Sequence, residues 1–544
     1  MAIWRVVRAL QADFCTNMQE TLGIPRNAIP RKVILAACFG TFIEWYDFLT
    51  FAALATYFGA LFFPPENQTA GLLASLATFG VGMVVRPLGS ALFGSLADRH
   101  GRRPVFIATI VLMGVATLGV GFLPTYAQVG MLAPALLVIL RLLQGFAMGG
   151  EVGGVAVYLT EHARAGQRGL YTSVLQLMGP LGILVSSVQI VLLHGVLDDA
   201  AFNDWGWRVP FWFSAALMLF FLKGRLALQE SPVFRQLQEQ HKVAHAPLRE
   251  CFSDRRTLGR MALLFFCVSA GGSLLFFSSQ IYAAVFLKNV VGLEDQAAKG
   301  LVMVSTLALV PLTILCGWLS DRMGRRPVML AGLLLGAVSI LPVFHALLHF
   351  GNPALERFNS ETQVVLYSDA CDYSPFVTPR NDCERNQDFL TKHGISYRLQ
   401  VARKLNEVAV SVGGIEVSGF NPEALASALK ARGWAPQADP QQVNALLLAL
   451  LLLVPAIAVA LITGPQTAVL AELFPARMRY TAAALPHNLS AGWIGGLSPF
   501  MVTLLSVQSG DALAGLWYPV ALLGMAFVIG LLFLPETRHV DLAE

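Results

Sequence analysis

The chain has 544 residues, of which 55% are hydrophobic and only 13% are charged. Soluble domains carry about 25% charged residues, so this composition excludes an ordinary soluble protein and predicts an integral membrane protein. The formal net charge of +4 is small and gives no reason to expect nucleic acid as a partner.

The first 32 residues are more polar than the rest of the N-terminal half. They contain Asp13, Glu20, Pro25 and Pro30, and the first long apolar run begins after Arg31-Lys32. A cleavable signal peptide would place an apolar stretch here without such interruptions. We therefore expect 1–32 to form an N-terminal tail and the first helix to remain in the membrane.

Long apolar runs occupy most of the remaining sequence. A helix that crosses a bilayer needs about 20 apolar residues. The sequence predicts twelve such helices, near 33–62, 69–97, 104–123, 130–160, 169–196, 207–226, 259–287, 298–320, 327–350, 444–471, 481–507 and 513–535. We expect an all-α membrane protein with two six-helix bundles, 33–226 and 259–535, a linker at 227–258 and a C-terminal tail at 536–544.

A short basic turn comes after the second predicted helix and recurs after the eighth. The first copy is Gly94-Ser-Leu-Ala-Asp98-Arg99-His-Gly101-Arg102-Arg103-Pro104, and the second begins 223 residues later at Gly317. Eight of the eleven positions are identical. An internal repeat of this kind predicts two similar, pseudo-symmetric halves.

A second repeat has a different offset. Glu161 is followed seven positions later by Arg168, and Glu472 is followed likewise by Arg479, which is an offset of 311 residues. The two offsets differ by 88 residues. An insertion of about that length between the repeated elements of the second half accounts for both offsets.

The basic residues of the short loops are unevenly distributed. One face of the predicted bundle carries 24 Lys and Arg residues, whereas the short loops of the other carry only Arg208, Lys288 and Lys299. Basic loops remain on the cytoplasmic side of a membrane. We therefore expect both termini to be cytoplasmic. We also expect the membrane to be a bacterial inner membrane.

Residues 351–443 form a polar insert between the ninth and tenth helices, on the predicted outer face. Alternation over Tyr397 to Phe420 predicts a β-hairpin that turns near Gly413-Gly414, and Asn421-Pro422 predicts the start of a helix over Glu423 to Arg432. Cys371 and Cys383 would lie in an oxidising compartment. We prefer a disulfide between them, which would contribute about 3 kcal/mol.

Several motifs resemble those of the major facilitator superfamily. The doubled Gly-x-Leu-x-Asp-Arg-x-Gly-Arg-Arg turn is its most specific signature. Four further segments are similar to the metabolite:proton symporter branch: Thr41–Phe48, Arg141–Gly154, Trp205–Phe211 and Glu472–Thr481. The resemblance covers all twelve helices but not the insert. It implies alternating access for a small-molecule substrate, and the branch includes carriers of dicarboxylates, tricarboxylates, shikimate, proline and betaine.

Charged residues at membrane depth are concentrated in the first half. They are Glu44, Asp47, Arg86, Arg141 and Glu151. A charge at this depth costs at least about 2.5 kcal/mol on insertion scales, so it calls for a functional explanation. The asymmetry places the predicted ion-handling machinery in the first six helices.

Glu44 and Asp47 are three positions apart and share one helix face. Two neighbouring carboxylates in a low dielectric are not both ionised cheaply, so one of them is expected to exchange a proton. The resemblance implies that Asp47 pairs with Arg141, as the helix 1 carboxylate and helix 4 arginine of proton-coupled relatives do. A static ion pair is the alternative, and for Glu44 both interpretations stay open. For Glu151 we favour a bracing role.

Arg86 suits either an ion pair with Glu44 or a substrate carboxylate, and both remain open. Other polar or aromatic residues could line a cavity, although we favour interhelical hydrogen bonds as the explanation for them. The further candidate substrate-binding residues are Tyr46, Gln144, Gln176, Tyr282, His487, Asn488 and Trp493.

The two repeats also predict a cytoplasmic gate. The resemblance implies that Arg102 meets Glu161 near Arg168, and that Arg325 meets Glu472 near Arg479. Asp98 and Asp321 would lie against helix N-termini, where negative charge is favourable. These contacts would close the cytoplasmic side and break as the halves rock.

The sequence favours a proton symporter for a small organic acid or zwitterion, functional as a monomer in the lipid bilayer. It has no Walker-type nucleotide motif, no metal-ligand spacing and no expected cofactor. Gly179-Pro180-Leu-Gly182 partly resembles an antiporter signature, so exchange is an alternative, as is a transporter-fold sensor that uses the insert. A membrane enzyme is disfavoured because no nucleophile, base or metal cluster converges.

Overall fold

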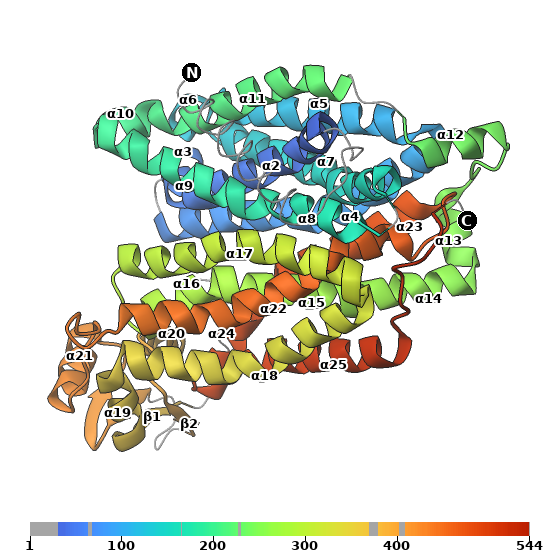
Figure 1. The fold of residues 1–544 in the computed structure, drawn as a ribbon. Coiled ribbons are helices and arrows are strands. Elements are labelled where there is room, and N and C mark those ends of the chain that lie inside the picture. Colours follow the sequence, from blue (N-terminus) through green and yellow to red (C-terminus); the bar gives the residue numbers. More distant parts are fainter. Residues whose placement is uncertain are drawn as a thin grey trace.

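The computed structural model describes residues 31–63, 68–164, 166–226, 230–368, 371, 379–401 and 408–542. The predicted tail at 1–32 lies almost wholly outside these residues. In the described part, long helices run side by side in an N-terminal and a C-terminal bundle, coloured blue to green and green to red in Figure 1. This arrangement confirms the predicted fold class.

The N-terminal bundle contains the six spans predicted for it, two of which are divided into two helices. Its helices are α2 (Arg31–Ala53), α3 (Ala55–Phe62), α4 (Gln68–His100), α5 (Arg102–Gly121), α6 (Tyr126–Val129), α7 (Leu132–His162), α8 (Arg168–Gln176), α9 (Met178–Val196), α10 (Asp199–Asp204) and α11 (Val209–Leu226). The first span comprises α2 and α3, and the fifth comprises α8 and α9.

The linker and the C-terminal bundle come next in the chain. Their helices are α12 (Pro232–Glu239), α13 (Pro247–Ser253), α14 (Arg255–Leu263), α15 (Ala270–Phe276), α16 (Ala283–Val285), α17 (Asp295–Met323), α18 (Arg325–Gly351), α22 (Ala445–Glu472), α23 (Arg479–Leu489), α24 (Ser498–Ser509) and α25 (Trp517–Phe533). Wider π-helical turns interrupt the seventh span at Leu264–Ser269, Phe277–Tyr282 and Phe286–Val290, and the eleventh at Ser490–Gly495. Turns of this type often occur at functional sites.

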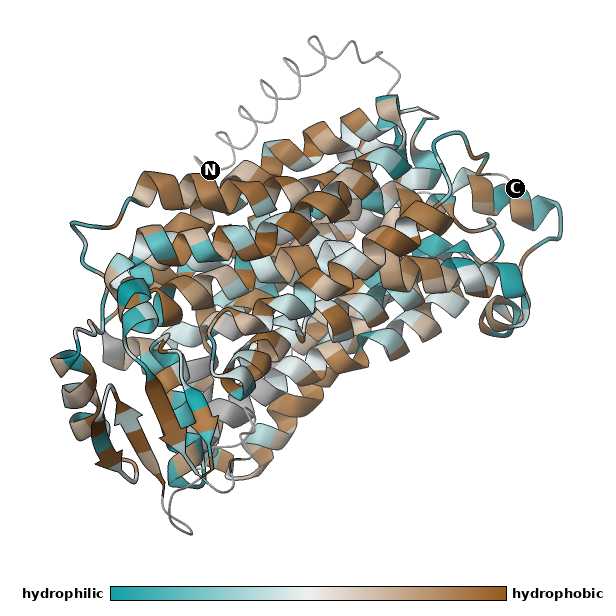
Figure 2. Ribbon diagram, turned by 90° about the horizontal axis from the view of Figure 1, so that it is seen from below, coloured by the Kyte–Doolittle hydropathy of each residue, from teal (hydrophilic) through white to brown (hydrophobic). Residues whose placement is uncertain are grey.

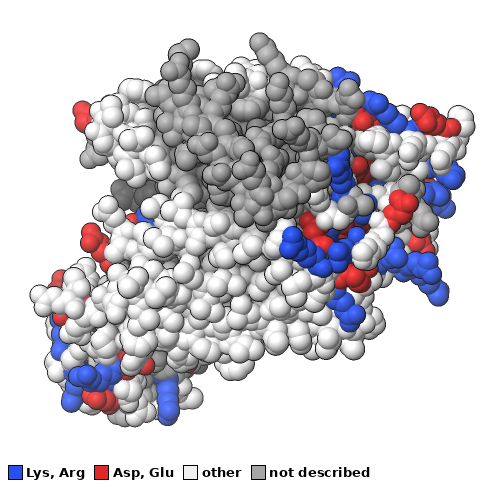
Figure 3. Space-filling view, in the orientation of Figure 1, with Lys and Arg blue, Asp and Glu red and all other residues white. Residues whose placement is uncertain are grey.

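Ten helical segments among the described residues are long and apolar enough to cross a membrane, and α11 contains a shorter apolar segment. Hydrophobic residues extend along the helices, whereas many hydrophilic residues lie in the end loops and the insert (Figure 2). On the face shown in Figure 3, charged side chains gather at the two ends, and the described surface between them is largely uncharged. An uncharged belt of this kind suits contact with lipid chains.

Helices α4 and α7 pack closely because glycines face the contact. A Cβ on Gly145 would overlap the carbonyl oxygen of Gly82, and one on Gly149 would overlap that of Arg86. A Cβ on Gly89 would overlap the carbonyl oxygen of Phe146 from the opposite direction. Small residues at such positions let two backbones approach, and here they fix where Arg86 lies relative to α7.

The insert is a small α+β unit. It contains α19 (Pro353–Glu361), β1 (Val364–Tyr367), α20 (Asp382–Lys392), β2 (Arg398–Gln400), β3 (Ala409–Val412), β4 (Ile415–Ser418) and α21 (Pro422–Ala431). Its sheet has the strand order β2-β1-β3-β4, with β1 parallel to β2 and antiparallel to β3. The predicted hairpin is confirmed as β3–β4, where Gly413 and Gly414 both have positive φ, as a tight hairpin turn requires.

Two other features of the insert agree with its sequence. The predicted helix is confirmed as α21, and the Asn421 side chain caps it by accepting from the backbone N of Ala424. Cys371 and Cys383 form a disulfide. Since Cys383 lies in α20, the disulfide ties the start of this helix to the segment after β1.

The insert docks on the end of the C-terminal bundle, at the lower left of Figure 1. The backbone N of Tyr397 donates to the Gly510 carbonyl at 2.7 Å, and its hydroxyl donates to the Val507 carbonyl at 2.6 Å. Burial raises the pKa of Tyr397 to about 12, so this hydroxyl keeps its proton at neutral pH. The insert is therefore tied to the residues that end α24.

Candidate functional site

A central cavity lies between the two bundles. The N-terminal bundle contributes residues of α2, α4, α7, α8 and α9 to its wall, and the C-terminal bundle contributes residues of α15, α17, α22 and α23. The polar and aromatic lining residues are Thr41, Trp45, Arg86, Gln176, Ser273, Phe276, Phe277, Thr313, Thr463, Gln466 and His487. A largely apolar cavity with a few polar groups is the usual form of a small-molecule site.

Arg86 is the one Lys or Arg residue among the described lining residues of this cavity. Its Nη2 donates to Oε1 of Glu44 at 3.0 Å, and its Nε donates to Oδ1 of Asn488 at 3.2 Å. Arg86 and Glu44 are both buried. The sequence left two roles open for Arg86, an ion pair with Glu44 and a contact with substrate. In the structure the same side chain pairs with Glu44 and lines the cavity.

Asp47 and Arg141 belong to one buried polar chain inside the N-terminal bundle. Thr117 donates to Oδ2 of Asp47 at 2.6 Å, and Gln144 donates to the Thr117 hydroxyl at 2.9 Å. Arg141 in turn donates to Oε1 of Gln144 at 2.9 Å, and its guanidinium lies 4.1 Å from the centre of the Phe51 ring. The opposite charges of Asp47 and Arg141 also interact. These four hydrogen-bonded residues, Asp47, Thr117, Gln144 and Arg141, lie away from the central cavity, because none of them lines its wall.

The structure separates the predicted substrate-binding residues into two groups. Arg86, Gln176 and His487 line the central cavity, and Gln176 also donates to Thr467 of the other bundle at 2.9 Å. Five others lie off its wall in this state: Tyr46, Gln144, Tyr282, Asn488 and Trp493.

Each of the five has a local reason for its position. Tyr46 donates to Gln189, and Gln144 belongs to the Asp47 chain. Tyr282 packs against the Phe286 and Phe344 rings. Asn488 contacts Arg86 and donates to the Gly149 and Ala484 carbonyls, and Trp493 is 50% exposed.

Sequence reasoning did not single out Gln466, Trp45 or Phe276 as cavity residues. Gln466 lies in α22, where its amide donates to the Val268 carbonyl at 3.1 Å. Trp45 and Phe276 come from different bundles and form an edge-to-face pair with ring centres 5.8 Å apart. Their shared wall depends on how the two bundles face each other, which local spacing does not reveal.

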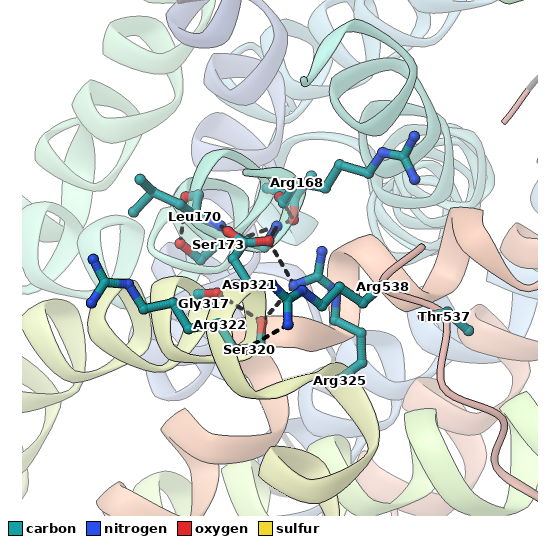
Figure 4. Close-up of polar contacts among 12 residues, drawn as sticks. Arg168, Leu170, Ser173, Gly317, Ser320, Asp321, Arg322, Arg325, Thr537 and Arg538 are labelled. Atoms are coloured by element: carbon teal, nitrogen blue, oxygen red, sulfur yellow. Dashed lines mark hydrogen bonds and ion pairs between the residues drawn. The ribbon is translucent and has the colours of Figure 1, made fainter. Parts of the chain in front are cut away.

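The gate residues cross between the two bundles. Asp98, at the end of α4, accepts from the backbone N of Tyr480 and of Thr481 at 3.2 and 2.8 Å. Asp321 of α17 accepts from the backbone N of Gly169 and of Leu170 at 2.9 and 2.8 Å. Each carboxylate therefore lies at the N-terminus of a helix in the opposite bundle, α23 or α8, where the helix dipole favours it. Figure 4 shows Asp321 directed at the start of α8, with Arg325 beside it.

Two buried acids complete the gate. The expected pairs of Arg102 with Glu161 and of Arg325 with Glu472 are present, and the second arginine of each acid comes from the opposite half. Glu161 accepts from Arg102 at 3.2 Å and from Arg479 of the other bundle at 3.0 Å. Glu472 pairs with Arg325 at 3.3 Å and with Arg168 of the other bundle at 3.7 Å. Arg168 was expected beside Glu161 and Arg479 beside Glu472. The pseudo-symmetric contact brings each arginine to the acid of the opposite half instead.

A further pair of acids brackets the gate, and sequence reasoning missed it. Glu230 accepts from the backbone N of Arg102 and Arg103 at 3.0 and 3.1 Å, at the start of α5. Glu536 accepts likewise from Arg325 and Arg326 at 2.9 and 3.2 Å, at the start of α18. The signal was present: a Glu followed by Ser or Thr comes soon after both the sixth and the twelfth helix.

The fold and the cavity define a membrane transporter of small molecules. The sequence profile of the family described as "Sugar (and other) transporter" matches residues 33–255. The inner membrane metabolite transport protein YhjE of Escherichia coli is 31% identical over 98% of this chain and 100% of its own length. A citrate-proton symporter of Klebsiella pneumoniae is 34% identical over 57% of this chain and 68% of its own.

A solved structure agrees in fold. That of the proton:xylose symporter XylE covers 94% of this chain and 97% of its own, with 18% identity and a TM-score of 0.59. The chain belongs to the major facilitator superfamily and is a multi-pass inner-membrane transporter of metabolites, not an enzyme. The resemblance noted in the sequence is confirmed.

Proposed function

We propose that this protein is a proton-coupled symporter of a small organic acid or zwitterion that works by alternating access as a monomer. The observation that carries the proposal is the buried chain from Asp47 through Thr117 and Gln144 to Arg141. A buried carboxylate and arginine stabilise a fold poorly, so a proton-dependent role accounts for them better than a static brace.

The position of this chain supports coupling to the substrate. It crosses α2, α5 and α7, and both α2 and α7 also contribute residues to the central cavity. A proton on Asp47 would weaken its attraction for Arg141 and change how these helices pack. Substrate and proton would thus act on the same helices, as cotransport requires.

The gate contacts support a state closed at one end of the bundles. By the distribution of basic loops, we place this end and both termini in the cytoplasm. The cavity then opens to the outside in this state, and the insert lies on the outer face. Breaking the gate as the bundles rock would open the cavity inward.

The first test is uptake into proteoliposomes with an imposed pH gradient, screening carboxylates, betaines and aromatic acids. We expect Asp47→Asn to abolish accumulation driven by the gradient and to leave substrate exchange measurable. The amide has nearly the same shape as the carboxylate, but it does not take up and release a proton at physiological pH.

Asp295→Asn is the matched control. Asp295 forms ion pairs with Lys288 and Lys299 at 2.7 and 2.6 Å on an exposed helix start, and this variant should accumulate substrate normally. If Asp47→Asn accumulates substrate as well as the parent protein does, the proposed proton role of Asp47 is wrong.

A further inference from the structure

The ion pair of Arg86 and Glu44 stands between two cavities. Arg86 lines the central cavity, whereas Glu44 is not among its lining residues. Glu44 instead lines a second, smaller cavity inside the N-terminal bundle. Of the two paired side chains, Arg86 therefore borders the central cavity and Glu44 borders the second one.

The second cavity contains another carboxylate. Its lining includes Glu151 of α7 and Thr109 of α5, and the Thr109 hydroxyl donates to Oε2 of Glu151 at 3.1 Å. Two carboxylates that border one small space of low dielectric are not both ionised cheaply. Glu44 thus shares this cavity wall with a second carboxylate while it is hydrogen-bonded to Arg86.

We propose that Arg86 binds the carboxylate of the substrate, and that Glu44 holds a proton while the substrate is bound. The proposal rests on the proposed proton-coupled symport and adds a second, substrate-facing proton site to it. Protonation makes Glu44 neutral, so the guanidinium then takes a carboxylate from the central cavity. When the substrate leaves, Glu44 releases its proton and pairs with Arg86 again, so that one carboxylate always neutralises one arginine.

The composition of the cavity wall narrows the substrate class. Arg86 is its one arginine or lysine among the described residues, and the other polar groups are amides, hydroxyls and His487. A second or third substrate carboxylate would enter without a cationic partner, which is costly in a desolvated site. Trp45, Phe276 and Phe277 offer ring faces for an apolar body or a quaternary ammonium group. The substrate class is a compound with one carboxylate, either a monoanion or a zwitterion.

Other titratable groups face this pair. Glu151 lies across the second cavity, Asp47 is one turn further along α2, and His487 of α23 lies on the same cavity wall as Arg86. In the described contacts, the carboxylate that is hydrogen-bonded to Arg86 is that of Glu44, and none of these three groups forms such a bond. The pH dependence of substrate binding should therefore follow Glu44.

Equilibrium binding in nanodiscs between pH 5.5 and 8.5 tests the proposal without requiring transport. The probes are radiolabelled carboxylates with one, two and three carboxyl groups, including shikimate, glycine betaine, succinate and citrate. We expect the parent protein to bind the ligands that carry a single carboxylate. Their Kd should rise about tenfold per pH unit on the alkaline side. That slope is the signature of one proton bound with each substrate.

Glu44→Gln should make the Kd independent of pH over the range in which the parent varies. The double variant Glu44→Gln/Arg86→Gln should weaken binding at least 100-fold at every pH, and it leaves no unpaired buried charge that would unfold the protein. Glu356→Gln, which removes the acid of an exposed pair with His349 on the insert, is the matched control and should bind as the parent does.

The proposal would be overturned if succinate or citrate bound as tightly as the ligands with one carboxylate, or more tightly, or if no carboxylate in the panel bound. It would also be overturned if the double variant bound substrate as the parent does, or if Glu44→Gln kept the parent's dependence of Kd on pH. The proposed symport is tested separately. Ligands that bind with the expected pH slope but are not accumulated by a pH gradient would contradict symport alone. Accumulation that survives in Glu44→Gln with the parent's pH dependence would contradict this inference alone.

Discussion

Thr117 links the two charged residues of the proposed proton site. Its hydroxyl donates to Asp47 and accepts from Gln144, which accepts in turn from Arg141. The sequence did not single out Thr117, because a threonine in an apolar helix is usually satisfied by its own backbone. Only the packing of α5 against α2 and α7 brings its hydroxyl between the two side chains.

We expect Thr117→Val to alter the pH profile of uptake. Valine has nearly the same shape but lacks the donor, and a hydrogen bond to a charged group is worth about 1.5–3 kcal/mol. Loss of a donor to the ionised carboxylate favours the protonated form, so the profile of initial uptake rate should move to higher pH. Thr160→Val is the control, because Thr160 donates only to the Ala156 carbonyl of its own helix. A profile identical to that of the parent would exclude Thr117 from the proton site.

At the scale of elements, short-range sequence patterns predicted the helices and the hairpin, which form through short-range interactions. The long apolar helices were predictable from apolar length, and the β3–β4 hairpin from alternation around Gly413-Gly414. The parallel pairing of β1 with β2 was not predicted, because it joins Val365 to Arg398 across a helix and no short-range signal encodes it. The gate acids were predicted, but their arginine partners from the other bundle required the arrangement of the two halves.

The glycine contact between α4 and α7 gives a prediction at this scale. Gly149→Ala should lower thermal stability and weaken substrate binding, because the new Cβ would overlap the Arg86 carbonyl and push the helix that carries Arg86 away. Overpacking of this kind costs about 1–3 kcal/mol. Thermal unfolding followed by intrinsic fluorescence, with binding measured on the same samples, provides the test.

Gly80→Ala in α4, the partner helix of this contact, is the control. A Cβ on Gly80 would meet no atom within 4 Å, and alanine is the better helix former by about 1 kcal/mol. This variant should be as stable as the parent or slightly more so. If Gly149→Ala behaves in the same way, the two helices are not held at contact distance by their glycines.

At the scale of the whole molecule, the gate holds the two bundles together at one end. Its two halves are equivalent, since Glu161 joins Arg102 to Arg479 and Glu472 joins Arg325 to Arg168. Both acids contact arginines of both bundles. They therefore stabilise the closed end without favouring either half, which suits an element that must open and close in each transport cycle.

Glu161→Gln and Glu472→Gln should each shift the protein toward the state that is open at the gate. Loss of one partner of a buried ion pair costs about 3–5 kcal/mol, and every 1.4 kcal/mol changes a population ratio tenfold. Distances between spin labels on the two bundles would report the shift. Glu250→Gln, at an exposed pair with Arg477 near the gate, should leave the distance distribution unchanged. An unchanged distribution in both gate variants would contradict the assigned role.

The insert is attached to the C-terminal bundle near α17, α18 and α24. Its contacts include those of Tyr397 with Val507 and Gly510 and that of Ala438 with Gly292. Within the described part of the chain, no residue that lines the central cavity comes from it. We therefore expect a protein in which a short linker replaces 355–440 to retain part of its uptake and to lose some thermal stability, because the end of α24 loses its cover. Tyr397→Phe, which removes one hydrogen bond worth about 1 kcal/mol, should lower stability slightly and leave uptake intact. Complete loss of uptake in the deletion variant, with normal membrane insertion, would make the insert part of the transport pathway and would favour its use in reading the solute.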